Sequence, residues 1–510
     1  MKFSLTAVLA LMTPWLAPSA VQAQQPGAAQ DLPVLFASPG SETQPGDLWL
    51  RARQVQVRQD LLLDGRVTRL QLNLFDDLEL VAVREDLEDA WGGGKVWIGN
   101  IEGDPESSVV FSMMQSSTTG SIRYQDRLYR LEPDSFLQDS IVEIDENKFQ
   151  PCATGPGQHV VSPENKSQQG GGQARSTQGG AIVDVLVCYT PQAKSGAGGT
   201  SGIESLINLA VTETNQAYEA SEVTQRLQLV HMAEMVGYSE TGSFSTELSR
   251  LRNTNDGHMD EAHTLRDQYG ADAVALIVNG TQYCGIAYLM TNVSHSFRSS
   301  AFSVTARTCA TGYYTFGHEL GHNFGCAHDR ANAGSAAYPY SYGYRTTNNA
   351  YRTIMAYYPG TRIKRFSNPN ITYGGYPLGI AYPDPNSAEN WLGLNNASPT
   401  ISQWYDSIAP MLEVGTLVAG SQAEICVRNA RANAAVLLGY STTGPGPTNT
   451  IYGDVDLSPP IFSLNMTADN VGYAELSQTI PSSMRWVTVY LHAVDLVSGG
   501  LSNSTLAFIQ

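Results

Sequence analysis

The stretch HELGHNFGCAHD, residues 318–329, gathers three of the chain's nine histidines and one glutamate. The run before it, TGYYTFG, contains no proline, so we predict a helix from about Thr311 to Phe324. On such a helix His318 and His322 lie about 40° apart around the axis and about 6 Å apart along it. Two imidazoles can therefore reach one ion from the same face of the helix.

The third histidine can join them only if the chain turns. His328 would lie about 15 Å beyond His318 on a continuous helix, too far away to share an ion. Gly325 allows the turn, because glycine readily adopts the left-handed conformation that ends helices. Three histidines and an open fourth position are typical of catalytic rather than structural zinc. The sequence therefore predicts one catalytic Zn²⁺ bound by His318, His322 and His328, and no pattern in it indicates a calcium site.

Glu319 follows the first histidine and points about 100° away from it on the helix. This direction keeps the carboxylate out of the ligand set but close to whatever the metal binds. A general base for a water molecule is needed at that place. The alternative is a chance HExxH on a helix surface, but the extended pattern HExxHxxGxxH fixes five positions and includes the glycine that the turn requires.

The pattern HELGHNFGCAH resembles the zinc-binding signature of the metzincin peptidases. Asn323 and Asp329 are similar to residues of the reprolysin (adamalysin) branch. The later run TIMAYYPGTRIKRFSNPNITYGG, residues 353–375, resembles secreted bacterial reprolysin-like enzymes, among them the peptidyl-Asp metallopeptidase family. The resemblance covers about residues 180–408 and implies a metzincin fold, with a mixed twisted sheet and a zinc helix.

The resemblance also implies roles for two residues of the later run. Met355 would form the methionine turn beneath the metal. Tyr357 departs from adamalysins and resembles the tyrosine of astacins and serralysins, which ligates zinc or stabilises the oxyanion. The implied activity is that of a zinc endopeptidase acting on proteins or peptides, in which zinc polarises a water and Glu319 deprotonates it.

Three basic residues follow the methionine turn: Arg362, Lys364 and Arg365. In metzincins this segment walls the pocket for the residue after the cut. A basic pocket would bind a carboxylate, so we predict cleavage before Asp. The alternative is that these residues are solvated loop charges.

The run CGIAYLM, residues 284–290, is the expected edge strand of the sheet. Its position resembles that of the metzincin strand that pairs with substrate backbone, which implies substrate binding by Gly285, Ile286 and Ala287. The alternative is a hairpin with no role in binding.

The composition excludes several classes of protein. With 48 acidic and 30 basic residues the net charge is −18, which argues against nucleic-acid binding and favours a soluble protein. Residues 1–23 have a lysine, a short apolar run and small residues before Gln24, as a signal peptide does, and no other segment is apolar enough to span a membrane. We expect a secreted bacterial protein, and the oligomeric state is not indicated.

The chain of 510 residues exceeds one ordinary core, so several domains are expected. The order of a β-rich segment, a Gly/Ser/Gln-rich linker and the histidine motif predicts a zymogen, with Arg175 as a candidate processing point. We predict a signal peptide (1–23), a β-rich propeptide (24–161), a cleavable linker (162–180), an α/β peptidase domain (181–410) and a β-sandwich-like C-terminal domain (411–510).

Within the peptidase domain, apolar strands alternate with amphipathic helices, which predicts a parallel sheet. A further helix is expected from about Pro399. The predicted strands are residues 181–190, 226–236 and 271–278, and the predicted helices are residues 202–218 and 258–270.

Six cysteines in an exported chain meet oxidising conditions. Four lie in the predicted peptidase domain and allow three pairings, of which we favour Cys284 with Cys309 and Cys188 with Cys326. Cys152 lies upstream of the linker, and metzincin proregions often place a cysteine thiolate on the open zinc position. A disulfide between Cys152 and Cys426 is the alternative.

A function of another class is a secreted zinc-binding adhesion protein with a vestigial peptidase domain. Glu319, Gly325 and Met355 are all present, which counts against this alternative because a binding module needs no general base.

Overall fold

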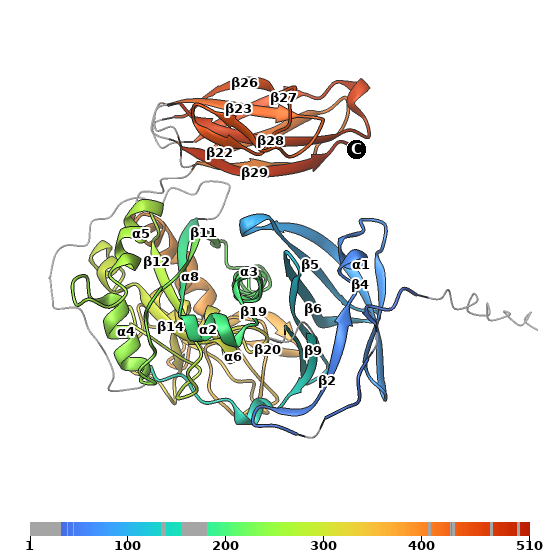
Figure 1. Cartoon of the computed structure of the whole chain (residues 1–510). Coiled ribbons are helices and arrows are strands. Elements are labelled where there is room, and N and C mark those ends of the chain that lie inside the picture. The colour runs from blue at the N-terminus through green and yellow to red at the C-terminus, as the bar shows by residue number, and fades with distance from the viewer. Residues whose placement is uncertain are drawn as a thin grey trace, which may run out of the picture.

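The computed structural model covers most of the chain (Figure 1). The predicted signal peptide and linker lie outside the described residues. The structure describes residues 32–510 except 38, 44, 134–138, 155–180, 406–409, 429, 431–433, 470–472 and 497–499.

A central sheet of five strands carries the order β11-β10-β12-β14-β13. The first four strands are parallel, and β13 pairs antiparallel with β14 at the edge, as predicted. Runs of buried, mostly apolar residues form β10, β12, β13 and β14, as expected for a parallel sheet covered on both faces, whereas the edge strand β11 is only partly buried. The strands are β10 (Ile182–Tyr189), β11 (Arg226–Glu234), β12 (Ala273–Val278), β13 (Gly285–Ala287) and β14 (Phe302–Ala306).

The helices of this part connect and cover the sheet. The predicted helices 202–218, 258–270 and 311–324 correspond to α3, α5 and α7, and α5 ends at Gly270 in the left-handed conformation. The prediction that a helix starts at about Pro399 was wrong, because that proline lies inside α8. Proline has no backbone N–H to donate to the carbonyl of Asn395, which accepts a hydrogen bond from the Ser398 hydroxyl instead. The helices are α2 (Pro191–Gly196), α3 (Thr200–Glu219), α4 (Phe244–Arg252), α5 (Glu261–Tyr269), α6 (Arg307–Ala310), α7 (Thr315–Asn323) and α8 (Asn390–Ile401), with the 3-10 turn η3 (His295–Ser300).

Short paired strands follow α7 and carry the chain around the methionine turn. They are β15 (Ala327–Asp329) with β16 (Tyr342–Gly343), β17 (Tyr351–Arg352) with β18 (Thr361–Arg362), and β19 (Asn368–Tyr373) with β20 (Tyr376–Leu378).

The N-terminal part forms one nine-stranded antiparallel sheet that curves back on itself. The backbone N–H of Leu35 donates to Gln71, and that of Gln71 donates to Pro33, which joins the two ends of the sheet. The sheet encloses its own apolar core. In spatial order its strands are β1 (Phe36–Ala37), β2 (Trp49–Val57), β9 (Asp139–Ile144), β8 (Arg127–Pro133), β7 (Ser117–Tyr124), β6 (Asp104–Met114), β5 (Gly94–Ile101), β4 (Leu78–Ala90) and β3 (Arg69–Phe75), with α1 (Gln59–Leu63), η1 (Trp91–Gly93) and η2 (Glu146–Lys148) beside them.

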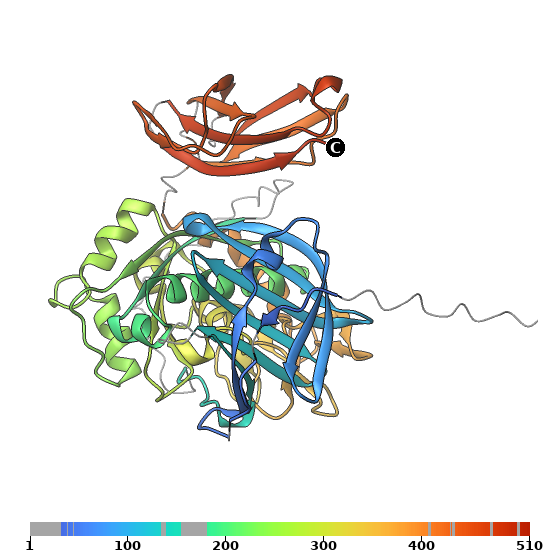
Figure 2. The same cartoon turned by 45° about the vertical axis from the view of Figure 1, so that its right-hand side comes forward.

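Helix α3 lies between this N-terminal sheet and the central sheet (Figures 1 and 2). Several hydrogen bonds join it to the N-terminal sheet. The Ser205 hydroxyl donates to the carbonyl of Ser112 at 2.7 Å and accepts from the N–H of Thr119 at 3.2 Å. The Asn208 amide donates to the carbonyl of Trp91 at 3.2 Å.

An apolar cluster joins Leu209 of α3 to Val96 and Val110 of the sheet. In addition, five buried residues of the N-terminal part belong to the large apolar core of the peptidase part: Ala52, Leu128, Val142, Ile144 and Phe149. Further along α3, the buried Glu213 carboxylate accepts from the Ser121 hydroxyl. The boundary therefore combines hydrogen bonds with apolar contacts that the two parts share.

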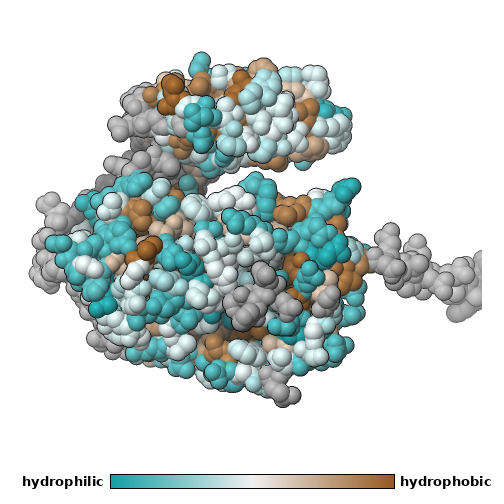
Figure 3. All heavy atoms as spheres, viewed as in Figure 1, coloured by the Kyte–Doolittle hydropathy of each residue, from teal (hydrophilic) through white to brown (hydrophobic). Residues whose placement is uncertain are grey.

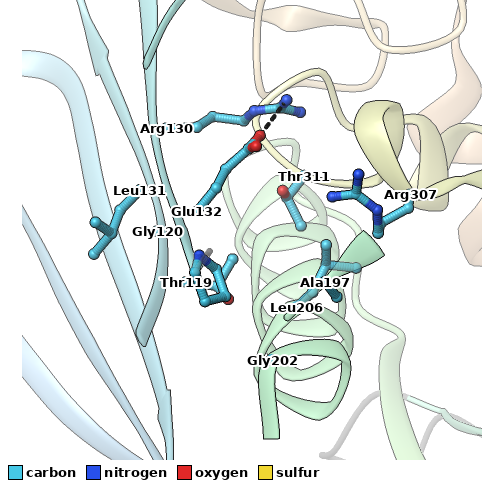
Figure 4. A pocket seen from close by; sticks show the side chains of 11 residues that line it. Thr119, Gly120, Arg130, Leu131, Glu132, Ala197, Gly202, Leu206, Arg307 and Thr311 are labelled. Atoms are coloured by element: carbon cyan, nitrogen blue, oxygen red, sulfur yellow. Dashed lines mark ion pairs between the residues drawn. The ribbon is translucent and has the colours of Figure 1, made fainter. Parts of the chain in front are cut away.

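Near the other end of the same contact, an ion pair on β8 faces the peptidase side (Figure 4). Arg130 pairs with Glu132 and also donates to the carbonyl of Thr308. Although burial alone would raise the pKa of Glu132, Arg130 and Arg307 lower it. Charged groups therefore lie on both sides of this boundary.

The C-terminal part forms two further sheets that enclose one apolar core. Figures 1 and 2 show these two sheets apart from the other sheets. On the face of the molecule that Figure 3 shows, hydrophobic residues are scattered among polar ones. None of the described helices is long and apolar enough to cross a membrane. The strands are β21 (Met411–Val414), β22 (Gln422–Arg428) and β27 (Ala474–Thr479) in one sheet, β26 (Phe462–Thr467), β23 (Ala435–Ser441), β28 (Thr488–Asp495) and β29 (Leu501–Phe508) in the other, and the pair β24 (Thr448–Thr450) and β25 (Gly453–Val455), with η4 (Ser482–Met484).

The cysteines agree with the predicted pairing only in part. Cys284 and Cys309 form a disulfide, which ties β13 to α6. The predicted pair of Cys188 and Cys326 was wrong, because the first lies inside β10, between β11 and β12, whereas the second lies after α7 against Ser341. Both are buried free thiols. The alternative pair of Cys152 and Cys426 does not form either.

Candidate metal and catalytic site

Helix α7 is buried along its whole length and presents His318, Glu319 and His322 to one place. It starts later than predicted, at Thr315, because Tyr314 before it is in the left-handed conformation. After α7, Gly325 has φ 94° and turns the chain, as predicted, so that β15 brings His328 back to the helix.

The three histidines converge through their Nε2 atoms. These atoms lie 3.2 Å apart for His318 and His322, 3.1 Å for His318 and His328, and 3.0 Å for His322 and His328. Nδ1 of His318 lies 2.8 Å from the carbonyl of Ile354, and Nδ1 of His322 lies 2.8 Å from that of Cys326. A ring that donates from Nδ1 keeps a lone pair on Nε2, so at least two lone pairs point into the same small space.

This donor set fits zinc. Burial lowers the pKa of His322 to about 4, and burial together with His322 lowers the pKa values of His318 and His328, so all three rings stay neutral, as ligands must. Tetrahedral zinc with usual Zn–N and Zn–S bonds separates two nitrogens by about 3.3 Å and a nitrogen from a sulfur by about 3.6 Å. Cys152 Sγ lies 3.7 Å from His322 Nε2, and the four ligand atoms lie within 4.8 Å of one another.

Glu319 lies beside the ligands, as its place on the helix predicts. Its Oε2 is 3.4 Å from Cys152 Sγ, and its Oε1 is buried with no hydrogen-bond partner among the described residues. Burial raises the pKa of Glu319 to about 8, despite the opposing effects of Cys152 and Arg362. A carboxylate with one unused oxygen next to a metal site can accept a proton there.

Gly285 of the edge strand leaves room for this carboxylate. A Cβ at position 285 would lie 2.4 Å from Glu319 Oε1. The replacement Gly285→Ala is therefore expected to push the carboxylate aside and to lower kcat/KM by about 100-fold, the effect of a misplacement near 1 Å. The measurement is peptide hydrolysis by the matured protein together with its melting temperature. Full activity at an unchanged melting temperature would contradict the expected crowding.

The edge strand β13 is covered by residues 151–154 of the N-terminal part. The N–H of Cys284 donates to the carbonyl of Pro151 at 3.3 Å, and the N–H of Ala153 donates to that of Gly285 at 2.9 Å. The N–H of Ala287 donates to the Thr154 hydroxyl at 3.1 Å. This segment adds a short strand to the sheet at the place where the prediction puts substrate.

Ile286 and Ala287 of this strand are buried in the full chain. That Gly285, Ile286 and Ala287 bind substrate stays a prediction.

Met355 and Tyr357 lie on two sides of the histidines. A Cβ on Gly321 of α7 would lie 2.7 Å from Met355 Sδ, so the methionine packs directly under the helix. The Tyr357 ring lies 4.1 Å from that of His328, and its hydroxyl donates to the carbonyl of Cys152 at 2.7 Å. The tyrosine hydroxyl therefore points at the residue that lies over the histidines.

Asp329 holds Tyr357 in this place, which the sequence did not indicate. One carboxylate oxygen accepts from the backbone N–H of Tyr357 at 3.0 Å, and the other pairs with Arg345 at 2.8 Å. The only signal in the sequence was the position of Asp329, directly after the third histidine.

The three basic residues after the methionine turn have different surroundings. Arg362 is buried and donates to the carbonyl of Tyr313 at 3.1 Å. Lys364 instead donates to Ser108 of the N-terminal sheet and to Gln216 of α3. The guanidinium of Arg365 lies 3.9 Å from the Glu106 carboxylate. That the three form one substrate pocket stays a prediction.

Comparison with known proteins gives one family. Residues 179–382 match the model described as metallo-peptidase family M12B, reprolysin-like. The chain is 37% identical over 394 residues to the peptidyl-Asp metalloendopeptidase of Stenotrophomonas maltophilia (strain R551-3), over 72% of this chain and 90% of that relative.

Two further relatives carry the same name. One, from Xanthomonas campestris pv. campestris, is 36% identical over 65% of this chain and 81% of the relative. The other, from S. maltophilia (strain K279a), is 36% identical over 72% of this chain and 90% of the relative. These alignments extend well beyond the 204 residues from 179 to 382 that the family model matches.

Proposed function

The chain belongs to the reprolysin-like family M12B of zinc metallopeptidases, and from this premise we propose that it is a secreted endopeptidase, made as a zymogen, that cuts peptide bonds before Asp. The chain is a zinc-dependent peptidase, and the bacterial relatives that are named for peptidyl-Asp cleavage support the proposed specificity. The observation that carries the mechanism is the convergence of three histidine nitrogens beside the Glu319 carboxylate.

The proposed chemistry divides between the metal and the chain. Bound zinc supplies a Lewis acid and lowers the pKa of water. His318, His322 and His328 are the proposed ligands, and the carbonyls of Ile354 and Cys326 orient the first two rings. Glu319 accepts a proton from the attacking water and passes it to the leaving amine.

Tyr357 is the proposed donor to the oxyanion. Its hydroxyl donates to the carbonyl of Cys152 in the full chain, so a carbonyl oxygen can already be bound at this place. Once residue 152 has left, the same hydroxyl is free to donate to the scissile carbonyl as charge develops on its oxygen.

Latency is proposed to depend on Cys152. Its Sγ lies within reach of the three histidine nitrogens and of Glu319, where a thiolate would take the fourth zinc position. Burial and the neighbouring Glu319 raise the pKa of this thiol, so a metal is needed to hold it as thiolate. Residues 151–154 also occupy the edge of β13, which a substrate would need.

The proposed maturation removes the N-terminal sheet. That sheet has a core of its own, which supports separation after a cut in the linker near Arg175. Separation must also break the apolar contacts that Leu128, Val142 and Phe149 make with the peptidase core. No observation favours the binding-protein alternative. The proposed division remains the one predicted: signal peptide 1–23, propeptide 24–161, linker 162–180, peptidase 181–410 and C-terminal domain 411–510.

A digest of an unlabelled proteome tests the proposal. The matured protein is incubated with the proteome with and without a zinc chelator, and new termini are identified by mass spectrometry. The expected result is a set of new termini that begin with Asp and disappear with the chelator. Chelator-sensitive termini that begin with other residues would overturn the proposed specificity, and no new termini would overturn the proposed endopeptidase.

A further inference from the structure

Two buried arginines face each other beside the site without a carboxylate partner. Arg352 of β17 and Arg362 of β18 are partners in a parallel pair of strands, and they are 3% and 4% exposed. Both lie over the ring of Tyr313, at 5.4 and 4.2 Å from its centroid. Among the ion pairs of the described residues, none includes either arginine. A buried cation is normally paired, so this arrangement needs an explanation.

The two arginines differ in how many of their guanidinium nitrogens donate hydrogen bonds. All three nitrogens of Arg352 donate, Nε to the carbonyl of Gly360, Nη1 to that of Ala356 and Nη2 to the Tyr313 hydroxyl. Arg362 makes one hydrogen bond, from Nη1 to the carbonyl of Tyr313. Its Nε is buried with no partner among the described residues. Arg362 therefore keeps donor capacity for a ligand, whereas Arg352 holds the loop and the ring.

Arg362 is also tied to the histidines through its neighbouring strand. It pairs with Arg352 of β17, and the carbonyl of Ile354, two residues after Arg352, lies 2.8 Å from His318 Nδ1. Lys364 and Arg365 have other partners in the peptidase part itself. Lys364 donates to Gln216 of α3 at 2.6 Å, and Arg365 donates to the carbonyl of Lys364 at 2.9 Å, whereas their contacts with Ser108 and Glu106 would be lost with the N-terminal sheet.

The N-terminal part covers this place in the full chain. The Phe149 ring packs against that of Tyr313 at a tilt of 40°, with ring centroids 4.3 Å apart, and Phe149 precedes Cys152 by only three residues. The segment that lies over the histidines thus also covers the ring that carries both arginines. Its removal would uncover Tyr313 and open a path towards Arg362.

We propose that Arg362 binds the side-chain carboxylate of the residue that follows the cut. The proposal rests on the proposed function and assigns the preference for Asp to one of the three basic residues. The guanidinium offers a planar donor edge that suits a carboxylate, and its buried surroundings strengthen such a charge-assisted pair. An uncharged residue at the same substrate position would leave the cation unpaired, which gives discrimination as well as affinity.

The test compares two peptides that differ only in Asp or Asn after the scissile bond. The matured wild-type protein is expected to have a kcat/KM about tenfold to 100-fold higher for the Asp peptide, the range of a charge-assisted pair. The replacement Arg362→Gln is expected to bring the ratio close to one, mainly by loss on the Asp peptide. Arg362→Lys keeps the charge without the planar edge and is expected to retain part of the preference.

Arg298→Gln is the matched control, because Arg298 also donates to one carbonyl, that of Trp404, and lies 5.7 Å from the ring of Tyr405. It is expected to leave the ratio unchanged. An unchanged ratio in Arg362→Gln would overturn the proposal while the peptidase assignment stands. Hydrolysis of neither peptide by the wild type would instead count against the proposed function.

A measurement on the wild type covers the case in which the variants do not fold. The matured protein is treated with phenylglyoxal with and without a tripeptide that begins with Asp, and modified arginines are mapped by mass spectrometry. The Asp tripeptide is expected to protect Arg362, and the corresponding Asn tripeptide is not. Equal modification of Arg362 in both cases would overturn the proposal.

Discussion

Replacing Glu319 by Gln is expected to lower the kcat/KM of the matured protein by about 1,000-fold, within the range of a lost general base. Gln has nearly the same size, so the buried space beside Gly285 stays filled and the three histidines keep their places. The zinc content is therefore expected to stay near one ion per chain. The measurements are peptide hydrolysis and metal analysis on the same sample.

The control for this replacement is Glu261→Gln, which changes an exposed glutamate in the first turn of α5. It is expected to leave both activity and zinc content unchanged. Retained hydrolysis in Glu319→Gln at normal zinc content would show that another group accepts the proton. Loss of zinc along with activity would show that the carboxylate mainly supports the metal site.

Replacing Cys152 by Ala is expected to raise the activity of the uncut chain by about 10- to 100-fold, because the ligand that competes for the fourth zinc position is gone. Full activity is not expected. Ala153 and Thr154 can still pair with β13, and their backbone contacts do not depend on the thiol. The measurement is hydrolysis of a short peptide by material whose intact mass shows that residues 155–180 have not been cut.

Cys426→Ala serves as the control, since Cys426 is a free thiol in the C-terminal part, next to Glu413. It is expected to leave the uncut chain latent. If the uncut Cys152→Ala chain shows no activity, latency depends on the backbone contacts of residues 151–154 with β13 rather than on the thiol. An active uncut wild type would remove the zymogen proposal altogether.

The part of the site that lies within residues 318–328 could be predicted from the sequence. The spacing of His318, Glu319 and His322 on a helix determines the directions in which their side chains point. Gly325 indicates the turn that brings His328 back to the helix. The parallel strands could be predicted for a similar reason, since each is a short apolar run between helical patterns. The predicted start at Pro399 failed because proline was taken to begin a helix, whereas α8 tolerates it near its end.

The long-range half of the site could not be predicted in this way. Cys152 and Glu319 are 167 positions apart, and no local pattern states that their side chains meet. The different surroundings of Arg362, Lys364 and Arg365 likewise depend on which neighbour each meets after folding. The pairing of Cys188 with Cys326 failed for the same reason, because a count of cysteines carries no information on distance.

The edge of the central sheet holds sulfur in two oxidation states at once. Cys284, directly before β13, is oxidised in the bridge to Cys309, whereas Cys152, whose neighbours Pro151 and Ala153 bond to the backbone beside it, is a free thiol, as the proposed latency requires. If Cys152 binds zinc as proposed, a reductant strong enough to open the bridge is expected to leave this thiol available, whereas oxidation of the thiol is expected to abolish its binding to the metal.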